Sequence, residues 1–360
     1  MFARLTTGIT QGRIGRTTFI IGLSVLALML ALALSGCGAR NSAENEYPPV
    51  GSEPTVAEPV VLPKWPYTGL DAESLELTQR RPLSVKIENH TAARPQTGLN
   101  EADVVYETIA EGGITRFNCI FHSNVPSRLG PVRSGRLSDM WIVPQYDGLF
   151  FFSGANGQVL DRVAADKLDD MSHDAAASLY SRSSDRSAPH NLYLTTDTVY
   201  DLAQRKGYPV TAQLEPLAFA PTESIATTVT ASSVKVPISN YVTVNWKWDA
   251  DNAVFNRFHY DVAHKDSTGK QVTAKNVVII WAKYTPQSKL NKGSVTYDIT
   301  LGGTTGKASL FIGGQRIDGT WEAERNAPPV FKDASGNPIL LNPGNTWVEA
   351  IPLDIKITVL

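Results

Sequence analysis

Alternating apolar and polar positions predict strands in the first half of the folded part, which begins near residue 80. Residues 83–87, 103–109 and 114–121 alternate with the period of two of a β-strand, and residues 149–152 form an unbroken apolar run. We also expect helices at residues 134–146, with Ser134 as the cap, and at 158–168 and 196–206. No regular strand–helix–strand rhythm appears, so the pattern predicts an α+β fold.

The second half is predicted to be mostly β. Residues 241–248 alternate between apolar and polar side chains, and glycine pairs at 302–303 and 313–314 signal turns. Further strands are expected at residues 254–262, 275–283, 294–301, 307–312 and 351–360. We therefore expect a β-rich C-terminal domain.

A basic leader with Arg4, Arg13 and Arg16 precedes an apolar run from residue 17 to residue 34. Basic residues, then apolar residues, then small residues form the layout of a secretory signal. We predict a signal peptide at residues 1–36. The alternative is an uncleaved membrane anchor, because the run is just long enough to span a bilayer as a helix.

The end of this run, Leu34-Ser35-Gly36-Cys37, resembles the lipobox of bacterial lipoproteins. The resemblance implies cleavage before Cys37 and acylation of that residue, with palmitate-type chains on its sulfur and its new N-terminus. Two or more chains hold a protein stably at a membrane. We expect an extracytoplasmic protein that is anchored by lipid to the outer face of the cell membrane.

Residues 37–79 carry recurrent prolines among Glu, Ser, Ala and Val, as a semi-stiff tether would. Trp65 and Tyr67 suggest that its last residues dock on the folded body. Beyond the leader, 324 of the 360 residues remain, which favours two domains. Pro216 and Pro221 flank a Thr/Ser-rich stretch, so we place the domains at residues 80–220 and 234–360.

Charged residues divide unevenly between these halves. Residues 80–214 hold eleven Arg and three Lys, whereas residues 234–360 hold three Arg and eleven Lys. Arginine suits bidentate contacts to carboxylate or phosphate, and lysine suits a solvated surface. The first half is therefore the better candidate for a site, with the second as a scaffold that could complete one wall of the cleft, unless drift produced the division. The net charge of −2 speaks against nucleic acid as a partner.

Polar clusters follow several predicted strands in the first half, where loops carry sites. The candidate ligand-binding residues are Glu88, Asn89, His90, Arg94, Gln96, Glu107, Glu111, Thr115, Arg116, Arg133, Ser134, Arg136, His190 and Asn191. Guanidinium groups beside glycine-rich loops suit an anionic ligand. The same groups could instead form a closed structural network of ion pairs.

Four segments carry a family resemblance: Asn89-His90 with residues 94–99, then residues 111–116, 130–134 and 189–191. Together with residues 276–278 and 343–347, they resemble the YerB-like lipoproteins, whose two parts are the DUF3048 N-terminal and C-terminal domains. The resemblance covers about residues 80–360. It implies a layered α/β sandwich of ββα type for the N-terminal domain, a lipid-anchored exported body and no established activity. The family often has Asp at the position of Glu88.

These observations predict noncatalytic binding of an anionic cell-envelope ligand, such as a wall glycopeptide, a polyol-phosphate polymer or a lipid headgroup. One alternative is an envelope protein-interaction module that uses an exposed Trp246 and Trp248 pair. Another is a hydrolase with His90 or His190 as base and Glu88 or Glu111 as orienting acid. We expect no cofactor and no metal, because His259 and His264 give only a weak ligand spacing. Cys119 is expected to be a small buried hydrophobe.

Overall fold

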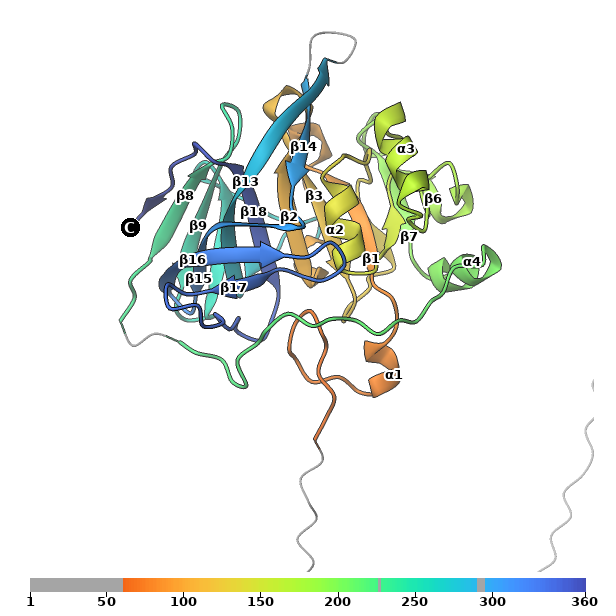
Figure 1. The fold of residues 1–360 in the computed structure, drawn as a ribbon. Helices are drawn as coiled ribbons and strands as arrows, with labels where there is room; N and C mark the ends of the chain where they lie inside the picture. Colours follow the sequence, from red (N-terminus) through yellow and green to blue (C-terminus); the bar gives the residue numbers. More distant parts are fainter. Residues whose placement is uncertain (1–60, 226–227, 290–294) are drawn as a thin grey trace, which may run out of the picture. The chain divides into compact units, whose positions relative to one another are not determined.

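The computed structural model describes residues 61–225, 228–289 and 295–360 (Figure 1). The predicted signal peptide, Cys37 and residues 37–60 of the predicted tether lie outside the described residues. The described part belongs to one compact unit. Its architecture is α+β and β-rich, as the sequence predicts.

The largest sheet in the described part has ten strands in the order β17-β16-β15-β13-β18-β2-β3-β1-β5, with β14 paired to β13. Its strands are β1 (Leu83–Glu88), β2 (Val104–Ile109), β3 (Thr115–Phe121), β5 (Leu149–Phe151), β13 (Asn276–Lys289), β14 (Val295–Thr300), β15 (Thr304–Ile312), β16 (Gln315–Ala323), β17 (Val330–Lys332) and β18 (Thr346–Pro352). Strand β18 lies between β2 and β13 and is parallel to both. The two halves of the sequence therefore share one hydrogen-bonded sheet.

Two smaller sheets complete the β-structure of the described residues. The six-stranded sheet contains β8 (Ser233–Pro237), β9 (Thr243–Asp249), β10 (Val254–His259), β11 (Val262–Ala263), β12 (Thr273–Ala274) and β19 (Thr358–Val359). The three-stranded sheet contains β4 (Arg128–Leu129), β6 (Tyr180–Arg182) and β7 (Leu192–Thr195). The α-helices are α1 (Leu75–Thr78), α2 (Asp139–Gln145), α3 (Gly157–Ala165) and α4 (Val199–Arg205), and the 3₁₀ helices are η1 (Thr91–Ala93), η2 (Leu99–Glu101), η3 (Glu111–Gly113) and η4 (Ala177–Leu179).

Both faces of the ten-stranded sheet are buried. On β18, Trp347 and Ile351 share a core with Trp246 of the six-stranded sheet, whereas Val348 and Ala350 belong to a core that includes Ile142 of α2. Successive side chains of a strand point to opposite faces. The ten-stranded sheet is thus a central layer, with the six-stranded sheet on one face and α2 on the other.

Two predicted elements have different bounds in the structure. The predicted helix at 134–146 begins only at Asp139, because residues 133 and 135 exchange backbone hydrogen bonds with residues 153 and 154. Ser134 is therefore not its cap. The predicted last strand at 351–360 is instead β18, which ends at Pro352, and the short β19. Proline lacks the N–H that would continue the ladder.

Residues 61–79, which the sequence analysis assigns to the tether, pack on the body. Trp65 and Tyr67 are buried, and the Tyr67 hydroxyl donates to the carbonyl of Tyr146 at 3.2 Å. The expectation that these aromatic residues dock is confirmed. Cys119 is fully buried in β3, where burial raises its pKa, so it behaves as a core residue. No helix in the described ranges is long and apolar enough to span a bilayer.

Candidate functional site

Arg257 of β10 lies between the six-stranded and the ten-stranded sheet and contacts residues of both. Arg257 is fully buried, and its Nη2 donates to Oε2 of Glu107 in β2 at 2.5 Å. Its guanidinium carbon lies 4.9 Å from the ring centroid of Trp347. A buried charge needs a partner of opposite sign, and Glu107 supplies it.

Arg257 also keeps two histidines, His259 and His264, in their neutral form. Its Nη1 donates to His259 Nε2 at 2.9 Å and to His264 Nδ1 at 2.7 Å. Burial and the Arg257 charge both lower the pKa of each imidazole, which keeps the rings neutral. The other nitrogen of each ring then carries the proton. His264 uses it to donate from Nε2 to Gln96 Oε1 at 2.9 Å, whereas His259 Nδ1 has no hydrogen-bond partner among the described residues.

These two histidines were the weak metal candidates of the sequence. The structure brings them together, with ring centroids 4.6 Å apart. However, the lone pairs that a metal would need face the Arg257 guanidinium. The arrangement suits donation of a hydrogen bond from His259 rather than metal ligation.

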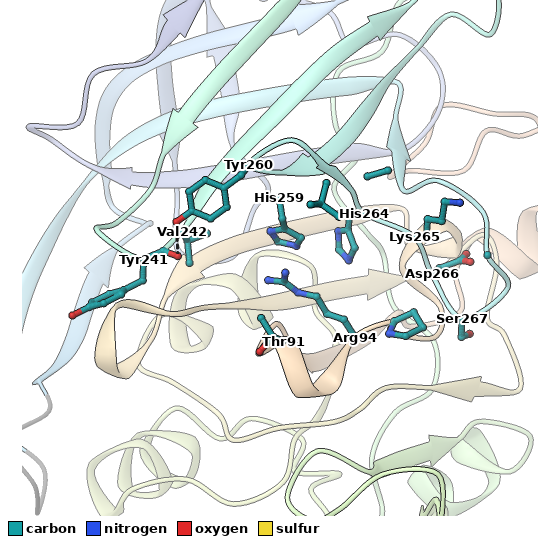
Figure 2. A pocket seen from close by; sticks show the side chains of 14 residues that line it. Thr91, Arg94, Tyr241, Val242, His259, Tyr260, His264, Lys265, Asp266 and Ser267 are labelled. Carbon is teal, nitrogen blue, oxygen red and sulfur yellow. Dashed lines mark hydrogen bonds between the residues drawn. The ribbon is translucent and has the colours of Figure 1, made fainter.

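A cavity with a volume of about 670 Å³ lies beside this network (Figure 2). Thr91, Arg94 and Pro95 of the first half line it, and the other lining residues lie between Tyr241 and Gly269. Most of the wall therefore comes from the second half, which the Arg/Lys distribution had marked as scaffold.

Arg94 reaches into this cavity without an ion pair to any described carboxylate. Its Nε donates to Asn89 Oδ1 at 3.2 Å and its Nη2 to the Asn89 carbonyl at 2.9 Å. Burial, and then the nearby Arg257 charge, lower the pKa of Arg94 to about 10, so it stays protonated at neutral pH. Figure 2 shows its guanidinium extending toward His259 from the opposite wall. Lys265 also lines the cavity, whereas the Asp266 carboxylate accepts hydrogen bonds from Asn100 and its own loop.

Glu88, Arg133, His190 and His90 form a separate cluster. Glu88 is buried and accepts from Arg133 Nε at 3.0 Å, and its other oxygen lies 3.0 Å from His190 Nδ1. The His190 ring stacks on His90 with centroids 4.8 Å apart. His90 also accepts from the backbone N–H of Ala92 at the start of η1.

A third group, Glu111, Arg116, Arg136 and Ser134, is closed on itself. The Glu111 carboxylate pairs with Arg136 and lies 3.6 Å from Arg116 Nη1. The Ser134 carbonyl accepts from both arginines, at 3.4 Å and 3.0 Å. Each charge meets its opposite within the cluster, as in a structural network that ties loops together.

The remaining candidates join the buried network or hold loops. Asn89 donates to Glu107 at 3.1 Å and to Thr115 at 2.7 Å, and Gln96 donates to the Glu88 carbonyl at 2.9 Å. Asn191 donates to the carbonyls of Ser183 and Arg186. The fourteen candidates thus do not share one cleft, and Arg94 is the one among them that lines the cavity of about 670 Å³.

Sequence reasoning missed Arg257, and it named His259 and His264 only as a weak metal-ligand pair. Arg257 and His259 occupy inward positions of β10, two residues apart, on the face that also carries Phe255. A polar residue at an inward position of an alternating strand is a signal that could have revealed them. Trp246 is fully buried and Trp248 packs on Phe255, so the exposed tryptophan pair is not present.

The fold and site define an α+β protein with an arginine-lined pocket between its first half and its six-stranded sheet. Residues 67–209 match the N-terminal domain, and residues 234–348 the C-terminal domain, of a protein of unknown function called DUF3048. The chain belongs to this DUF3048 family, as its resemblance to the YerB-like lipoproteins implies.

Two comparisons with proteins of Bacillus subtilis support this family assignment. The chain is 34% identical over 297 residues to a protein named "Putative lipoprotein YerB", across 80% of this chain and 86% of that protein. It also matches the crystal structure of the YerB protein with a TM-score of 0.72 and 33% identity, covering 82% of this chain and 99% of that one. Fold and family are therefore established together.

Proposed function

We propose that this protein is a lipid-anchored extracytoplasmic binding protein that takes the anionic group of a cell-envelope ligand into the Arg94 pocket. The observation that carries the proposal is the Arg94 guanidinium, which lines a cavity of about 670 Å³ and has no described carboxylate as ion-pair partner. Charge-assisted hydrogen bonds from arginine to carboxylate or phosphate are strong and directional.

Further contacts support an anion as the ligand. His259 Nδ1–H is free to donate, and Lys265 adds a second positive charge to the lining. Glu107 is the ion-pair partner of Arg257, and its charge also acts on Arg94. A bound anion would meet the Arg94 guanidinium and the neutral His259 donor, in a lining that also contains Lys265 and Asp266.

The anchor part of the proposal rests on Leu34-Ser35-Gly36-Cys37 and on the relative. That relative is named as a lipoprotein, and its similarity covers 80% of this chain. Acylation of Cys37 would hold the body at the membrane surface, where anionic wall polymers and lipid headgroups are found.

The hydrolase alternative rests on Glu88 and His190, whose contact would orient an imidazole base. Arg133 pairs with the same carboxylate and competes for its charge. Neither Glu88 nor His190 lines the Arg94 pocket. The interaction-module alternative depends on an exposed Trp246 and Trp248 pair, and Trp246 is buried. The geometry therefore favours binding.

The test uses the full-length protein in neutral-lipid nanodiscs with three probes: N-acetylmuramic acid, poly(glycerol phosphate) and glycerophosphoglycerol. We expect at least one probe to bind, and Arg94→Gln to weaken it about 10- to 100-fold, the loss expected for a charged hydrogen bond. Arg205→Gln, which removes an exposed arginine at the end of α4, is the matched control and should bind as the wild type does.

Calorimetric titration at low and moderate salt provides the affinities, and a melting curve confirms that each variant is folded. Absence of binding by all three probes would refute the proposal. Equal affinities of folded Arg94→Gln and wild type would refute it as well.

A further inference from the structure

Two exposed aromatic side chains stand at the mouth of the Arg94 pocket (Figure 2). Tyr241 is 69% exposed and Tyr260 is 53% exposed. Val262, also at the pocket, is 73% exposed. Large apolar side chains gathered at a cavity mouth are typical of a binding surface.

The backbone at Tyr260 is unusual for so bulky a residue. Tyr260 has φ +52°, in the left-handed region that favours glycine, at the turn between β10 and β11. Its hydroxyl donates to the Tyr241 carbonyl at 3.1 Å, its backbone N–H donates to Thr243, and its carbonyl accepts from Asn245. Three hydrogen bonds thus hold an exposed ring in a conformation that the turn alone would give to Gly or Asn.

The polar groups of the same lining are of three kinds. Arg94 and Lys265 are cationic, Asp266 is a carboxylate that accepts hydrogen bonds from Asn100 and its own loop, and His259, Thr91 and Ser267 offer neutral hydrogen-bonding groups. A simple anion would need only the cationic groups. Neutral donors and acceptors beside a flat ring suit a ligand with hydroxyl groups around an apolar face.

We infer that the pocket takes a pyranose sugar that carries an anionic substituent, with the sugar face against Tyr260 and the anion at Arg94. This inference rests on the proposed function and names its ligand class. The flat C–H face of a sugar meets the aromatic ring, its hydroxyls meet the neutral groups, and its carboxylate or phosphate meets the guanidinium.

The experiment compares four probes on the full-length protein by titration calorimetry and ligand NMR. N-acetylmuramic acid and glucosamine 6-phosphate are acidic sugars, N-acetylglucosamine is the neutral sugar, and D-lactate is an acid without a ring. We expect at least one acidic sugar to bind about tenfold or more tightly than the neutral sugar and than lactate. The preferred acidic sugar identifies carboxylate or phosphate as the anion.

Tyr260→Asn removes the ring but keeps a residue that tolerates the left-handed backbone, so the turn should fold. It should weaken the acidic sugar about tenfold and leave lactate unchanged. Tyr260→Phe retains the ring and should keep most of the affinity. If lactate binds as tightly as the acidic sugars, or Tyr260→Asn has no effect, the sugar assignment is wrong while anion binding at Arg94 stands. If no acidic sugar binds, the sugar assignment is wrong, and the proposed function fails too only if poly(glycerol phosphate) and glycerophosphoglycerol also do not bind.

Discussion

At the scale of single residues, Glu107 and Glu349 determine which of the buried groups between the two larger sheets carry a charge. They are neighbours on the paired strands β2 and β18, and both are fully buried. Arg257 pairs with Glu107, and Trp246 Nε1 donates to Glu349 Oε1 at 3.0 Å. One guanidinium cannot offset two adjacent buried carboxylates. Burial and the Glu107 charge accordingly raise the pKa of Glu349 well above 4.5, and it is held as the neutral acid.

Glu349→Gln should therefore flatten the pH dependence of stability. Between pH 4.5 and the raised pKa, the folded state binds a proton that the unfolded state has lost, so stability falls as pH rises. The slope that this group contributes is about 1.4 kcal/mol per pH unit. Glutamine mimics the protonated acid without titrating, so the variant should gain stability over the wild type progressively above pH 4.5. Urea unfolding at pH 5, 6, 7 and 8 measures the difference.

Glu107→Gln is the matched control for that measurement. It removes the carboxylate that pairs with the buried Arg257 guanidinium and should cost about 3–5 kcal/mol. Parallel stability curves for Glu349→Gln and wild type would show that Glu349 does not carry the extra proton.

The sequence analysis selected some residues of this network and missed others. Glu107 and Thr115 were selected because they lie in predicted strands next to a polar, glycine-rich loop. Arg257 and Glu349 were missed because their contacts with Glu107 join strands that are far apart in the chain. Periodicity predicts which face of a strand a residue occupies, but not which distant strand that face will meet.

At the scale of elements, the loop that contains Arg186 holds the loop that contains Arg94, so that Arg94 can line the pocket. Arg186 donates from Nη1 to the Ala93 carbonyl and from Nη2 to the Pro95 carbonyl at 2.9 Å, on either side of Arg94. Asn191 in turn donates to the Arg186 carbonyl at 3.0 Å. Asn191, chosen from the sequence as a ligand contact, thus supports the loop that positions Arg94.

Arg186→Ala should loosen the segment that carries Arg94. Loss of two hydrogen bonds from a charged group frees the carbonyls of Ala93 and Pro95, so the amides of η1 should exchange hydrogen faster. Affinity for the acidic probe should fall about three- to tenfold, although Arg186 does not line the pocket. Hydrogen exchange and calorimetry test both effects, with Arg205→Ala as control. Unchanged protection of residues 93 and 94 would contradict this role.

At the scale of the whole molecule, strands from the two family domains pair in one sheet, which the sequence did not predict. Strand β18, from the C-terminal half, pairs along its length with β13 of its own half, and its residues 346–349 pair with β2 of the other half. The composition change near residue 220 separates the two halves along the chain but says nothing of this pairing. The α+β class was predictable from local patterns, whereas the shared sheet and the pocket beside it depend on long-range contacts.

The proposed lipid anchor would determine where this body works, and it depends on acylation of Cys37. If the lipobox resemblance holds, the native protein begins at Cys37, carries the added mass of acyl chains and is recovered with membranes. Cys37→Ser removes the thiol that would be acylated, so the acyl mass should disappear and the protein should no longer be processed to a lipid-bearing N-terminus at residue 37. Intact mass spectrometry of membrane and soluble fractions measures both. Cys119→Ser is the matched control, because this buried thiol lies inside β3 and should leave the acyl mass unchanged. An unmodified Cys37 behind an intact leader would favour the uncleaved membrane anchor instead.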